Sequence, residues 1–160
     1  MLKIRIIAIG KIKENSIREL IDEYSKRLTR YCEMFIFEID DKEEFSDNKK
    51  DIERIVNEES KKIMKQLEKN NDYKILLDIK GKELNSIELA EKISSINNEL
   101  NKNIVFVIGG SNGVNDEVKN KVDFRLSFSK FTFPHQLFRV MLLEQIYRSF
   151  KIINNEKYHK

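Results

Sequence analysis

Two stretches near the C-terminus carry residue types suited to ligand binding and proton transfer. Residues 104–114, IVFVIGGSNGV, place five apolar residues directly before a glycine-rich turn. This order is typical of a buried strand that ends in a turn whose backbone a ligand can approach closely. Residues 127–140, SFSKFTFPHQLFRV, place an uncharged Thr and Phe loop before His135 and Arg139. An imidazole and a guanidinium beside such a loop suit proton transfer and anion binding.

The elements that must position these loops alternate along the chain. Apolar runs predict strands, and apolar residues at helical spacing predict the helices between them. Strands separated by helices favour an α/β fold with a mainly parallel sheet and helices on both faces. The two loops would then follow neighbouring strands, where open α/β sheets bind ligands in a crevice. The predicted strands are 3–9, 34–39, 73–79, 104–108 and 124–128, and the predicted helices include 52–67, 115–122 and 135–153.

Two further helices are predicted from their capping signals. Ser16 and Glu19 have the spacing of a capping box before an apolar stripe that ends at Leu28. Ser86 is the expected cap of a helix whose inward residues run from Ile87 to Ile96.

Composition points to one folded, soluble domain over residues 1–160, with 40% hydrophobic and 36% charged residues. The first apolar run is interrupted by Arg5 and is too short for a signal peptide or a membrane span, so the cytoplasm is the expected location. Cys32 is the only cysteine and receives no catalytic role.

Charge is distributed unevenly along the chain. Residues 1–103 hold 21 Lys and Arg against 22 Asp and Glu, whereas residues from Arg125 onward hold 7 against 2. The end that carries the candidate loops is therefore basic and would attract an anionic partner such as RNA. A solvated basic tail is the alternative.

The last predicted helix has more apolar surface than packing against one sheet requires. Eleven of its residues between Leu137 and Ile153 are apolar, and they spread around the helix. Burial of two or three additional Leu, Ile or Phe side chains contributes about 1.5 to 3 kcal/mol each, which is enough to drive association. We expect a two-fold homodimer through this helix, with a central place in a monomer's core as the alternative.

Common nucleotide and metal motifs are missing from the sequence. The first strand is followed by GKIK, without the spaced glycines of a dinucleotide-binding loop, and no GxxxxGK[ST] occurs. Two histidines and one cysteine without clustered spacing predict no metal site. Ser111 lies in GGSNG and not in the GxSxG turn of a hydrolase.

Several segments spread over the whole chain are distinctive: the opening KIRIIAIGK, the segment LLDIKGK, the turn FVIGGSNG, the stretch LSFSKFTFPHQLFRVMLLEQIYRSFKI and the terminal YHK. In these segments the chain resembles the RlmH (YbeA-type) family of SPOUT-class methyltransferases. The resemblance implies a C-terminal trefoil knot, a homodimer and S-adenosylmethionine bound by the knot loops. It also implies methylation at N3 of a pseudouridine in 23S ribosomal RNA, on assembled ribosomes or large subunits.

The resemblance assigns the cofactor contacts, and the residues agree, because an adenine and a sulfonium require an apolar slot with exposed backbone groups. Lys130 is the exception, so we expect its side chain to point to solvent or to RNA phosphate while its backbone contacts the cofactor. The expected cofactor residues are Leu77, Gly109, Gly110, Phe128, Ser129, Lys130, Phe131, Thr132 and Phe133.

The candidate catalytic residues are His135, Arg139, Tyr158 and His159. Either histidine could accept the N3 proton, and Arg139 could hold phosphate or stabilise the developing anion. An aromatic ring, an imidazole and a cation at the chain end suit stacking and phosphate contact. The alternatives are that His135 caps the helix backbone, that Arg139 pairs on the surface with Glu144 or another acid, and that the tail is frayed.

Two other functional classes stay open. One is a different α/β enzyme that binds a nucleotide in the same crevice, such as a nucleotide hydrolase. The other is a noncatalytic ribosome-binding module. Binding of S-adenosylmethionine, and transfer of its methyl group to RNA, would separate the three.

Overall fold

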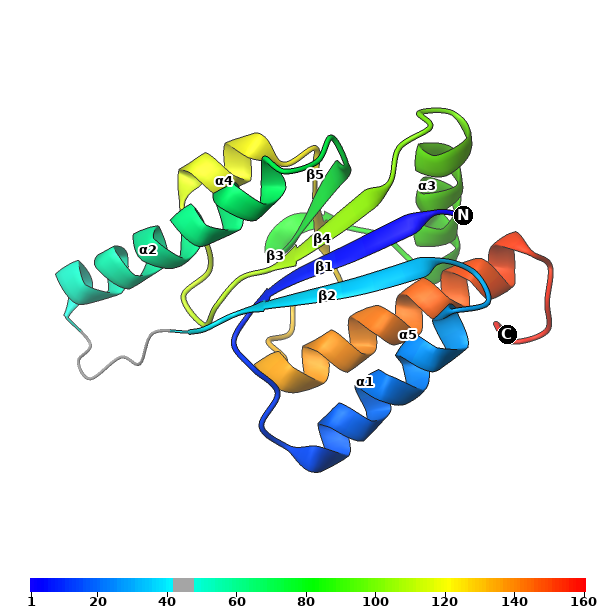
Figure 1. The fold of residues 1–160 in the computed structure, drawn as a ribbon, viewed down its shortest axis with the longest axis horizontal. Coiled ribbons are helices and arrows are strands. Elements are labelled where there is room, and N and C mark those ends of the chain that lie inside the picture. Colours follow the sequence, from blue (N-terminus) through cyan, green and yellow to red (C-terminus); the bar gives the residue numbers. More distant parts are fainter. Residues whose placement is uncertain (42–47) are drawn as a thin grey trace.

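The structure is a computed structural model that describes residues 1–41 and 48–160. Within these ranges, a sheet of five parallel strands lies between two groups of helices (Figure 1). The predicted α/β class with a parallel sheet and helices on both faces is therefore confirmed. The strands are β1 (Lys3–Ile9), β2 (Glu33–Ile39), β3 (Tyr73–Glu83), β4 (Ile104–Ile108) and β5 (Phe124–Ser127); the helices are α1 (Asn15–Leu28), α2 (Lys49–Leu67), α3 (Ser86–Asn98), α4 (Asp116–Lys121) and α5 (His135–Ile153).

The order of the strands brings the two candidate loops together. The sheet runs β2-β1-β4-β3-β5, so β4 lies at its centre and β5 at its edge, with β3 between them. All five residues of β4 are buried, which explains why this strand is a continuous apolar run. Because all neighbouring strands are parallel, the loops after β3, β4 and β5 leave the same edge of the sheet. The trefoil knot implied by the resemblance stays a prediction.

Alternate residues of β1 supply two separate cores. Ile4 and Ile6 face one core, which packs against α1, α3 and α5, whereas Ile7 and Ile9 face the other core, which packs against α2 and α4. This division follows from the two-residue period of a strand. Figure 1 shows α2 and α4 on one side of the sheet and α1 and α5 on the other.

Strand β3 is longer than predicted. It continues past Ile79 to Glu83, and both Leu77 and Lys82 pair with Leu126 of β5, so the strand bulges between them. Gly81 lies in this bulge, where a Cβ atom would come within 2.6 Å of the Arg125 carbonyl oxygen. Only glycine fits such a close approach of two backbones.

Both predicted helix caps were wrong. Helix α1 begins at Asn15, and its N-cap, Glu14, makes no capping bond through its side chain. The amide groups of Lys13 and Glu14 instead donate to the Gln136 side chain of α5, a partner far away in the sequence. In α3 the cap is the residue before Ser86: Asn85 and Glu88 form a capping box.

Helix α5 packs against both α1 and α3 beneath the sheet. Val140, Leu142, Leu143, Ile146 and Phe150 are buried in this core. Much of the apolar surface of the helix is thus covered within one chain, although Leu137 is 40% exposed.

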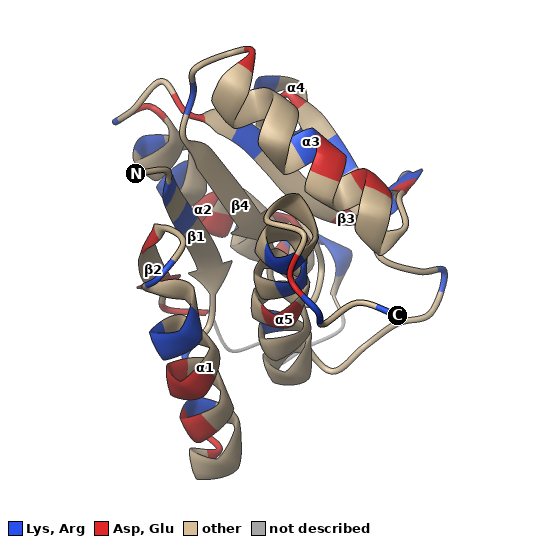
Figure 2. Cartoon of the chain, turned by 90° about the vertical axis from the view of Figure 1, so that its right-hand side faces the viewer, with Lys and Arg blue, Asp and Glu red and all other residues tan. Residues whose placement is uncertain are grey.

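No helix within residues 1–41 and 48–160 is long and apolar enough to cross a membrane. Figure 2 shows acidic and basic residues interspersed along α1 and α3.

Candidate active site

A cleft of about 590 Å³ lies at the carboxyl ends of β3, β4 and β5. The glycine-rich turn after β4 and the phenylalanine loop after β5 form opposite parts of its wall, so the predicted crevice is present. Every expected cofactor residue except Lys130 lines it, namely Leu77, Gly109, Gly110, Phe128, Ser129, Phe131, Thr132 and Phe133, and His135 lines it as well. The bottom and rim include residues that sequence reasoning missed: Leu76, Asp78, Ile79, Lys80, Ile108, Lys119 and Phe138.

The glycine-rich turn is held tightly against the body of the protein. The Gly113 amide donates to the Gly110 carbonyl at 3.0 Å, and Gly113 has a φ of +78° that favours glycine. A Cβ atom at Gly110 would lie 2.7 Å from a carboxylate oxygen of Glu59, which is itself buried. The amide of Asn115 donates to the buried Ser60 hydroxyl at 2.9 Å. Helix α2 therefore supports the turn from behind and leaves its backbone open to the cleft.

The phenylalanine loop is apolar but partly open to solvent. Phe131 is 77% exposed, and its amide donates to the Ser129 hydroxyl at 3.0 Å. Phe128 and Phe133 pack against the Phe138 ring of α5, with ring centroids 5.0 and 6.1 Å apart. Phe128, Phe133 and Phe138 thus form an aromatic wall, while the exposed Phe131 ring offers a surface to a ligand or to RNA.

Lys130 is exposed and does not line the cleft. Its ammonium group is therefore kept away from the place where a positively charged sulfonium would lie. This position agrees with the expected orientation of its side chain toward solvent.

His135 faces the end of β4 instead of capping its own helix. Its Nε2 atom lies 2.9 Å from the Gly109 carbonyl oxygen, and Pro134, at the N-cap of α5, makes no capping bond through its side chain. A carbonyl only accepts, so Nε2 carries the hydrogen and donates it. In neutral His135 the Nδ1 atom is then the nitrogen with a free lone pair.

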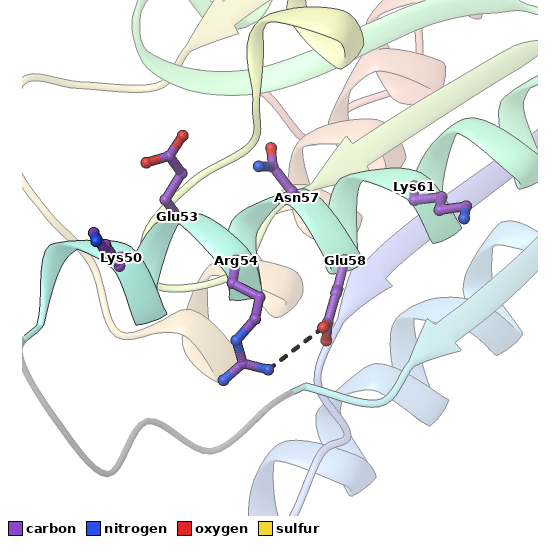
Figure 3. Close-up of a pocket in the computed structure, with 6 residues that line it drawn as sticks. All are labelled: Lys50, Glu53, Arg54, Asn57, Glu58 and Lys61. Atoms are coloured by element: carbon purple, nitrogen blue, oxygen red, sulfur yellow. Dashed lines mark hydrogen bonds and ion pairs between the residues drawn. The ribbon is translucent and has the colours of Figure 1, made fainter.

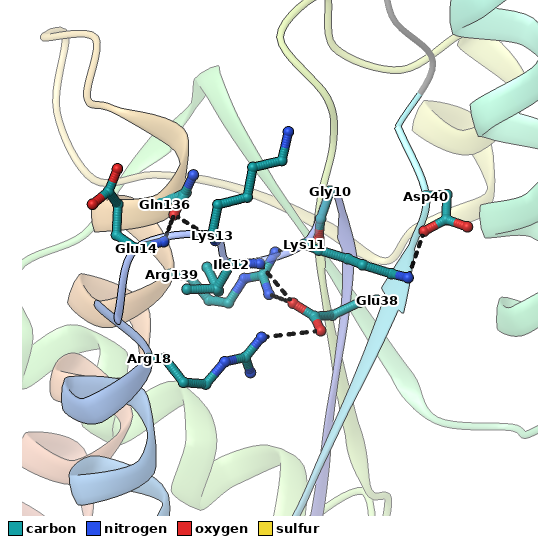
Figure 4. Close-up of polar contacts among 10 residues, drawn as sticks. All are labelled: Gly10, Lys11, Ile12, Lys13, Glu14, Arg18, Glu38, Asp40, Gln136 and Arg139. Carbon is teal, nitrogen blue, oxygen red and sulfur yellow. Dashed lines mark hydrogen bonds and ion pairs between the residues drawn. The ribbon is translucent and has the colours of Figure 1, made fainter. Parts of the chain in front are cut away.

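Arg139 is not a surface ion pair with Glu144. Its side chain is 1% exposed, and its guanidinium group contacts Glu38 of β2 and donates to the Gly10 carbonyl at 2.9 Å (Figure 4). Burial by itself raises the pKa of Glu38, but the bonds from Arg139 and the Ile12 amide outweigh this effect and lower it. Burial lowers the pKa of Arg139, against the opposing effect of Glu38.

The last three residues lie along the other end of α5. The Tyr158 hydroxyl donates to Glu144 at 3.2 Å, and the Arg148 guanidinium lies over the Tyr158 ring, 4.7 Å from its centroid. His159 Nδ1 lies 3.3 Å from Arg148. Neither Tyr158 nor His159 lines the cleft of its own chain. Glu144, which Tyr158 contacts, follows His135 by nine residues, about 14 Å along a helix.

Burial, and then the charge of Glu144, raises the pKa of Tyr158 to about 12. The phenol is thus protonated near neutral pH and acts as a donor. Of the two tail side chains proposed for catalysis, His159 is the one that carries imidazole nitrogens.

Comparisons with known proteins decide the family. The family described as "Predicted SPOUT methyltransferase" matches residues 2–159. The chain belongs to the SPOUT methyltransferase family. A relative from Methanococcus vannielii is 52% identical over 161 residues, covering 99% of this chain and 100% of the relative. Another, named ribosomal RNA large subunit methyltransferase H of Fusobacterium nucleatum, is 50% identical over 160 residues, with 99% and 100% covered.

The fold is also found among solved structures. A methylase family protein from Haemophilus influenzae has a TM-score of 0.55 and 12% sequence identity, and the alignment covers 98% of this chain and 70% of that one. At this identity the likeness concerns the fold alone.

A second groove of this SPOUT methyltransferase adjoins the cleft. It has a volume of about 500 Å³ and lies between α5, α1 and the start of α3. Phe128 and Phe133 line both hollows. Tyr24, Val140 and Met141 add further apolar surface, with Glu144 at one side. The aromatic wall of the cleft is therefore continuous with an open apolar groove on α5.

A depression on α2 and the buried Cys32, both within the described part of the chain, do not form a comparable site. A depression of about 440 Å³ on α2 is lined only by polar side chains of that one helix, such as Arg54, Asn57 and Glu58, and Figure 3 shows them projecting from it in different directions. Burial raises the pKa of the Cys32 thiol to about 12, so it is a poor nucleophile. Within residues 1–41 and 48–160, no three His, Cys, Asp or Glu side chains are grouped to hold a metal ion.

Proposed function

We propose that this SPOUT methyltransferase uses S-adenosylmethionine to methylate N3 of a pseudouridine in 23S ribosomal RNA, acting on assembled ribosomes or large subunits. The observation that carries the proposal is the cleft of about 590 Å³ in which the glycine-rich turn and the phenylalanine loop meet. The names of its relatives support ribosomal RNA of the large subunit as the substrate.

The cleft suits this cofactor because its walls are apolar and rich in backbone groups. Leu77, Gly109 and Gly110 would contact the cofactor from β3 and β4, and the loop from Phe128 to Phe133 would contact it from β5. An adenine ring fits an apolar slot and pairs with backbone donors and acceptors. The cofactor supplies a methyl group that its sulfonium releases to a nucleophile.

The chain's own residues align the base and take its proton. When N3 of the pseudouridine gains a methyl group, its hydrogen leaves as a proton, and no covalent enzyme intermediate is required. His135 lines the cleft and has its Nε2 hydrogen bonded to Gly109, so its Nδ1 atom is our candidate acceptor. His159 is the second candidate, because it is the other imidazole of the chain.

The tail would contact the RNA rather than the cofactor. Tyr158, His159 and Lys160 offer a ring for stacking, an imidazole and a cation for phosphate. Several basic residues nearby are partly neutralised, since Arg148 pairs with Glu144 and Lys151 with Glu156. A small RNA-binding surface of this kind is expected to need the ribosome to define its target.

We further propose a homodimer in which the tail of one subunit completes the cleft of the other. Tyr158, His159 and Lys160 do not line the cleft of their own chain. A two-fold axis across α5 would place the end of one helix beside the start of its partner. The apolar groove lined by Tyr24, Val140 and Met141 is the surface that such an association would bury.

Two inactive variants test this arrangement when they are coexpressed. Deletion of residues 158–160 removes the tail, and Gly110→Val displaces the turn that lines the cleft, because a Cβ atom there meets Glu59. A mixed dimer would combine one intact cleft with the partner's intact tail and regain activity. Persistent inactivity of a mixed dimer that both subunits have demonstrably joined would mean that the tail does not act across the dimer.

The function itself is tested by incubating the protein with labelled S-adenosylmethionine and ribosomes that lack the modification, then mapping the labelled nucleotide. Label at N3 of one pseudouridine of 23S RNA is the expected result. Calorimetry with S-adenosylmethionine and with a nucleoside triphosphate separates the alternatives: triphosphate binding alone would favour a nucleotide hydrolase, and ribosome binding without transfer would favour a noncatalytic module.

A further inference from the structure

An ion pair between a buried guanidinium group and a half-buried carboxylate ties the start of α5 to the N-terminal half of the chain. Arg139 is among the largest fully buried side chains, and Glu38 reaches it from β2, 101 residues away in the sequence. Arg139 also donates to the Gly10 carbonyl at 2.9 Å (Figure 4). Both terminal nitrogens of the guanidinium group are thus engaged inside the protein, which leaves them unable to hold an RNA phosphate.

Stability alone is a weak explanation for this pair. Removal of a guanidinium and a carboxylate from water is costly, and apolar side chains of similar volume often stabilise a protein equally well or better. The Nε atom of Arg139 is buried without a hydrogen-bond partner, which adds to the cost. The pair does fix the orientation of its partners, because the planar guanidinium group binds two acceptors at defined angles.

One of the two acceptors, Gly10, lies beside His135. Gly10 has a φ of +95°, and a Cβ atom at this residue would lie 3.8 Å from His135 Cε1, so the imidazole is its neighbour on that side. Arg139 follows His135 by one helical turn and lies on the same face of α5. A fixed Arg139 therefore holds both the helical turn that carries His135 and the Gly10 backbone beside it.

Further contacts extend this connection through the loop after β1. Glu38 accepts a hydrogen bond from the Ile12 amide at 3.2 Å and pairs with Arg18 at 3.4 Å. Gln136, the residue after His135, accepts from the amide of Lys13 at 3.1 Å. Figure 4 shows that these side chains converge on the segment between β1 and α1.

We infer that Arg139 and Glu38 are positioning residues that hold the His135 imidazole against the Gly109 carbonyl. In this arrangement Nε2 stays bonded and Nδ1 stays directed for proton acceptance. The inference rests on the proposed function for the catalytic role of His135, and it replaces a direct contact of Arg139 with RNA by an indirect role.

Nuclear magnetic resonance of the histidine rings tests the inference without any assay of activity. The chain has only two histidines, so His159→Gln assigns both sets of ring signals. The test variant is Glu38→Leu with Arg139→Met, which replaces the pair by apolar side chains and avoids an isolated buried charge. We expect the His135 Nε2 signal to move toward that of an imidazole free in water. Ring signals identical to those of the wild type in the folded variant would overturn the inference.

Kinetics on ribosomes provide the second measurement. We expect kcat of the double variant to fall about tenfold or more, because small misplacements of a reacting group are costly, while the Kd for S-adenosylmethionine changes less than about threefold. Arg139→Lys keeps the charge without the two-pronged geometry and should show an intermediate loss. It is also the variant to measure if the apolar pair does not fold. A kcat within about twofold of the wild type in both variants would overturn the inference.

Lys11 and Asp40 provide a matched control. They form an exposed ion pair at 3.1 Å between the same two strand ends, with side chains 64% and 73% exposed. Asp40→Asn should leave the His135 signals and kcat unchanged; a change equal to that of the test variant would overturn the inference, because any charge in this region would then suffice. If the wild type transfers no methyl group but the His135 signals respond to the buried pair, only the proposed function fails.

Discussion

The side chains at the two ends of α5 are held by different kinds of contact. At its first turn, His135 and Arg139 are held by backbone carbonyls and one half-buried carboxylate, in contact with strand ends of the sheet. From its midpoint onward, Glu144 and Arg148 are partly exposed and are held mainly by each other and by the chain's own tail. The first arrangement is complete within one chain. The second leaves the Tyr158 ring half-buried and the His159 imidazole exposed at the surface.

This difference separates the two binding tasks of a methyltransferase. A cofactor is small and is bound again in every cycle, so a rigid cleft at the ends of buried strands suits it. A ribosomal RNA segment is large, and contacts at the surface of the protein suit it better. Changes at the tail should therefore affect RNA methylation, whereas changes at the cleft should affect cofactor affinity first.

Deletion of Tyr158, His159 and Lys160 is expected to have the largest effect. Methylation of ribosomes should fall by about a hundredfold to a thousandfold, since stacking on one aromatic ring alone contributes about 1–3 kcal/mol and the phosphate contact adds to it. The Kd for S-adenosylmethionine, measured by calorimetry, should stay within about twofold. Tyr158→Phe keeps the ring and should lose much less. Unchanged turnover of the truncated protein would show that the two ends of α5 do not divide the work in this way.

Gly110→Val should produce the opposite pattern. The new side chain would meet Glu59 and Ile9 and push the turn out of place. Each displaced hydrogen bond to the cofactor weakens binding by about 0.5–1.5 kcal/mol, so the Kd for S-adenosylmethionine should rise about ten- to a hundredfold. Asn120→Ala, on the exposed side of α4, is the control and should change nothing. Wild-type affinity of the valine variant would remove the turn from the cofactor site.

Met141→Glu tests the region between the two ends. Met141 lines the apolar groove beside Phe128 and Phe133 and is half-buried. A carboxylate buried at a subunit interface is costly, so we expect the dimer to dissociate about tenfold more readily or more. Size-exclusion chromatography with light scattering at micromolar concentration measures this. A wild-type protein that is already a monomer there would contradict the proposed dimer.

The sequence predicted best those features that depend on local periodicity. The bounds of β1, β4 and α5 agree residue for residue with the apolar patterns that predicted them. The crevice between the two loops could also be predicted, because parallel strands leave their loops at one edge of the sheet.

Features that depend on distant partners could not be predicted in this way. Glu38 occupies an ordinary alternating position in the edge strand FIFEI, and nothing local indicates that Arg139 pairs with it. Gln136 binds the amide groups before α1 in a similar way, which is why the predicted capping box at Ser16 was wrong. The approach of Glu59 to Gly110 likewise joins segments from opposite halves of the chain.

Acid should weaken the first end of α5 before the protein unfolds completely, and this is the smallest effect that we predict. The pKa of Glu38 is lowered in the folded protein, so its carboxylate contributes stability above its unfolded pKa of about 4.3. That contribution is lost as the pH falls through the lower, folded value. Because Glu38 is partly exposed, we expect a change of about 1 kcal/mol or less in the free energy of unfolding.

Urea unfolding at pH 7 and near pH 3 measures this change, and the variant with Glu38→Leu and Arg139→Met should lose less stability than the wild type on acidification. Other carboxylates contribute equally to both proteins, so the difference isolates Glu38. An identical loss in the two proteins would mean that Glu38 is not stabilised by Arg139. The start of α5 would then be held by packing alone, and the contrast between its two ends would reduce to a difference in burial.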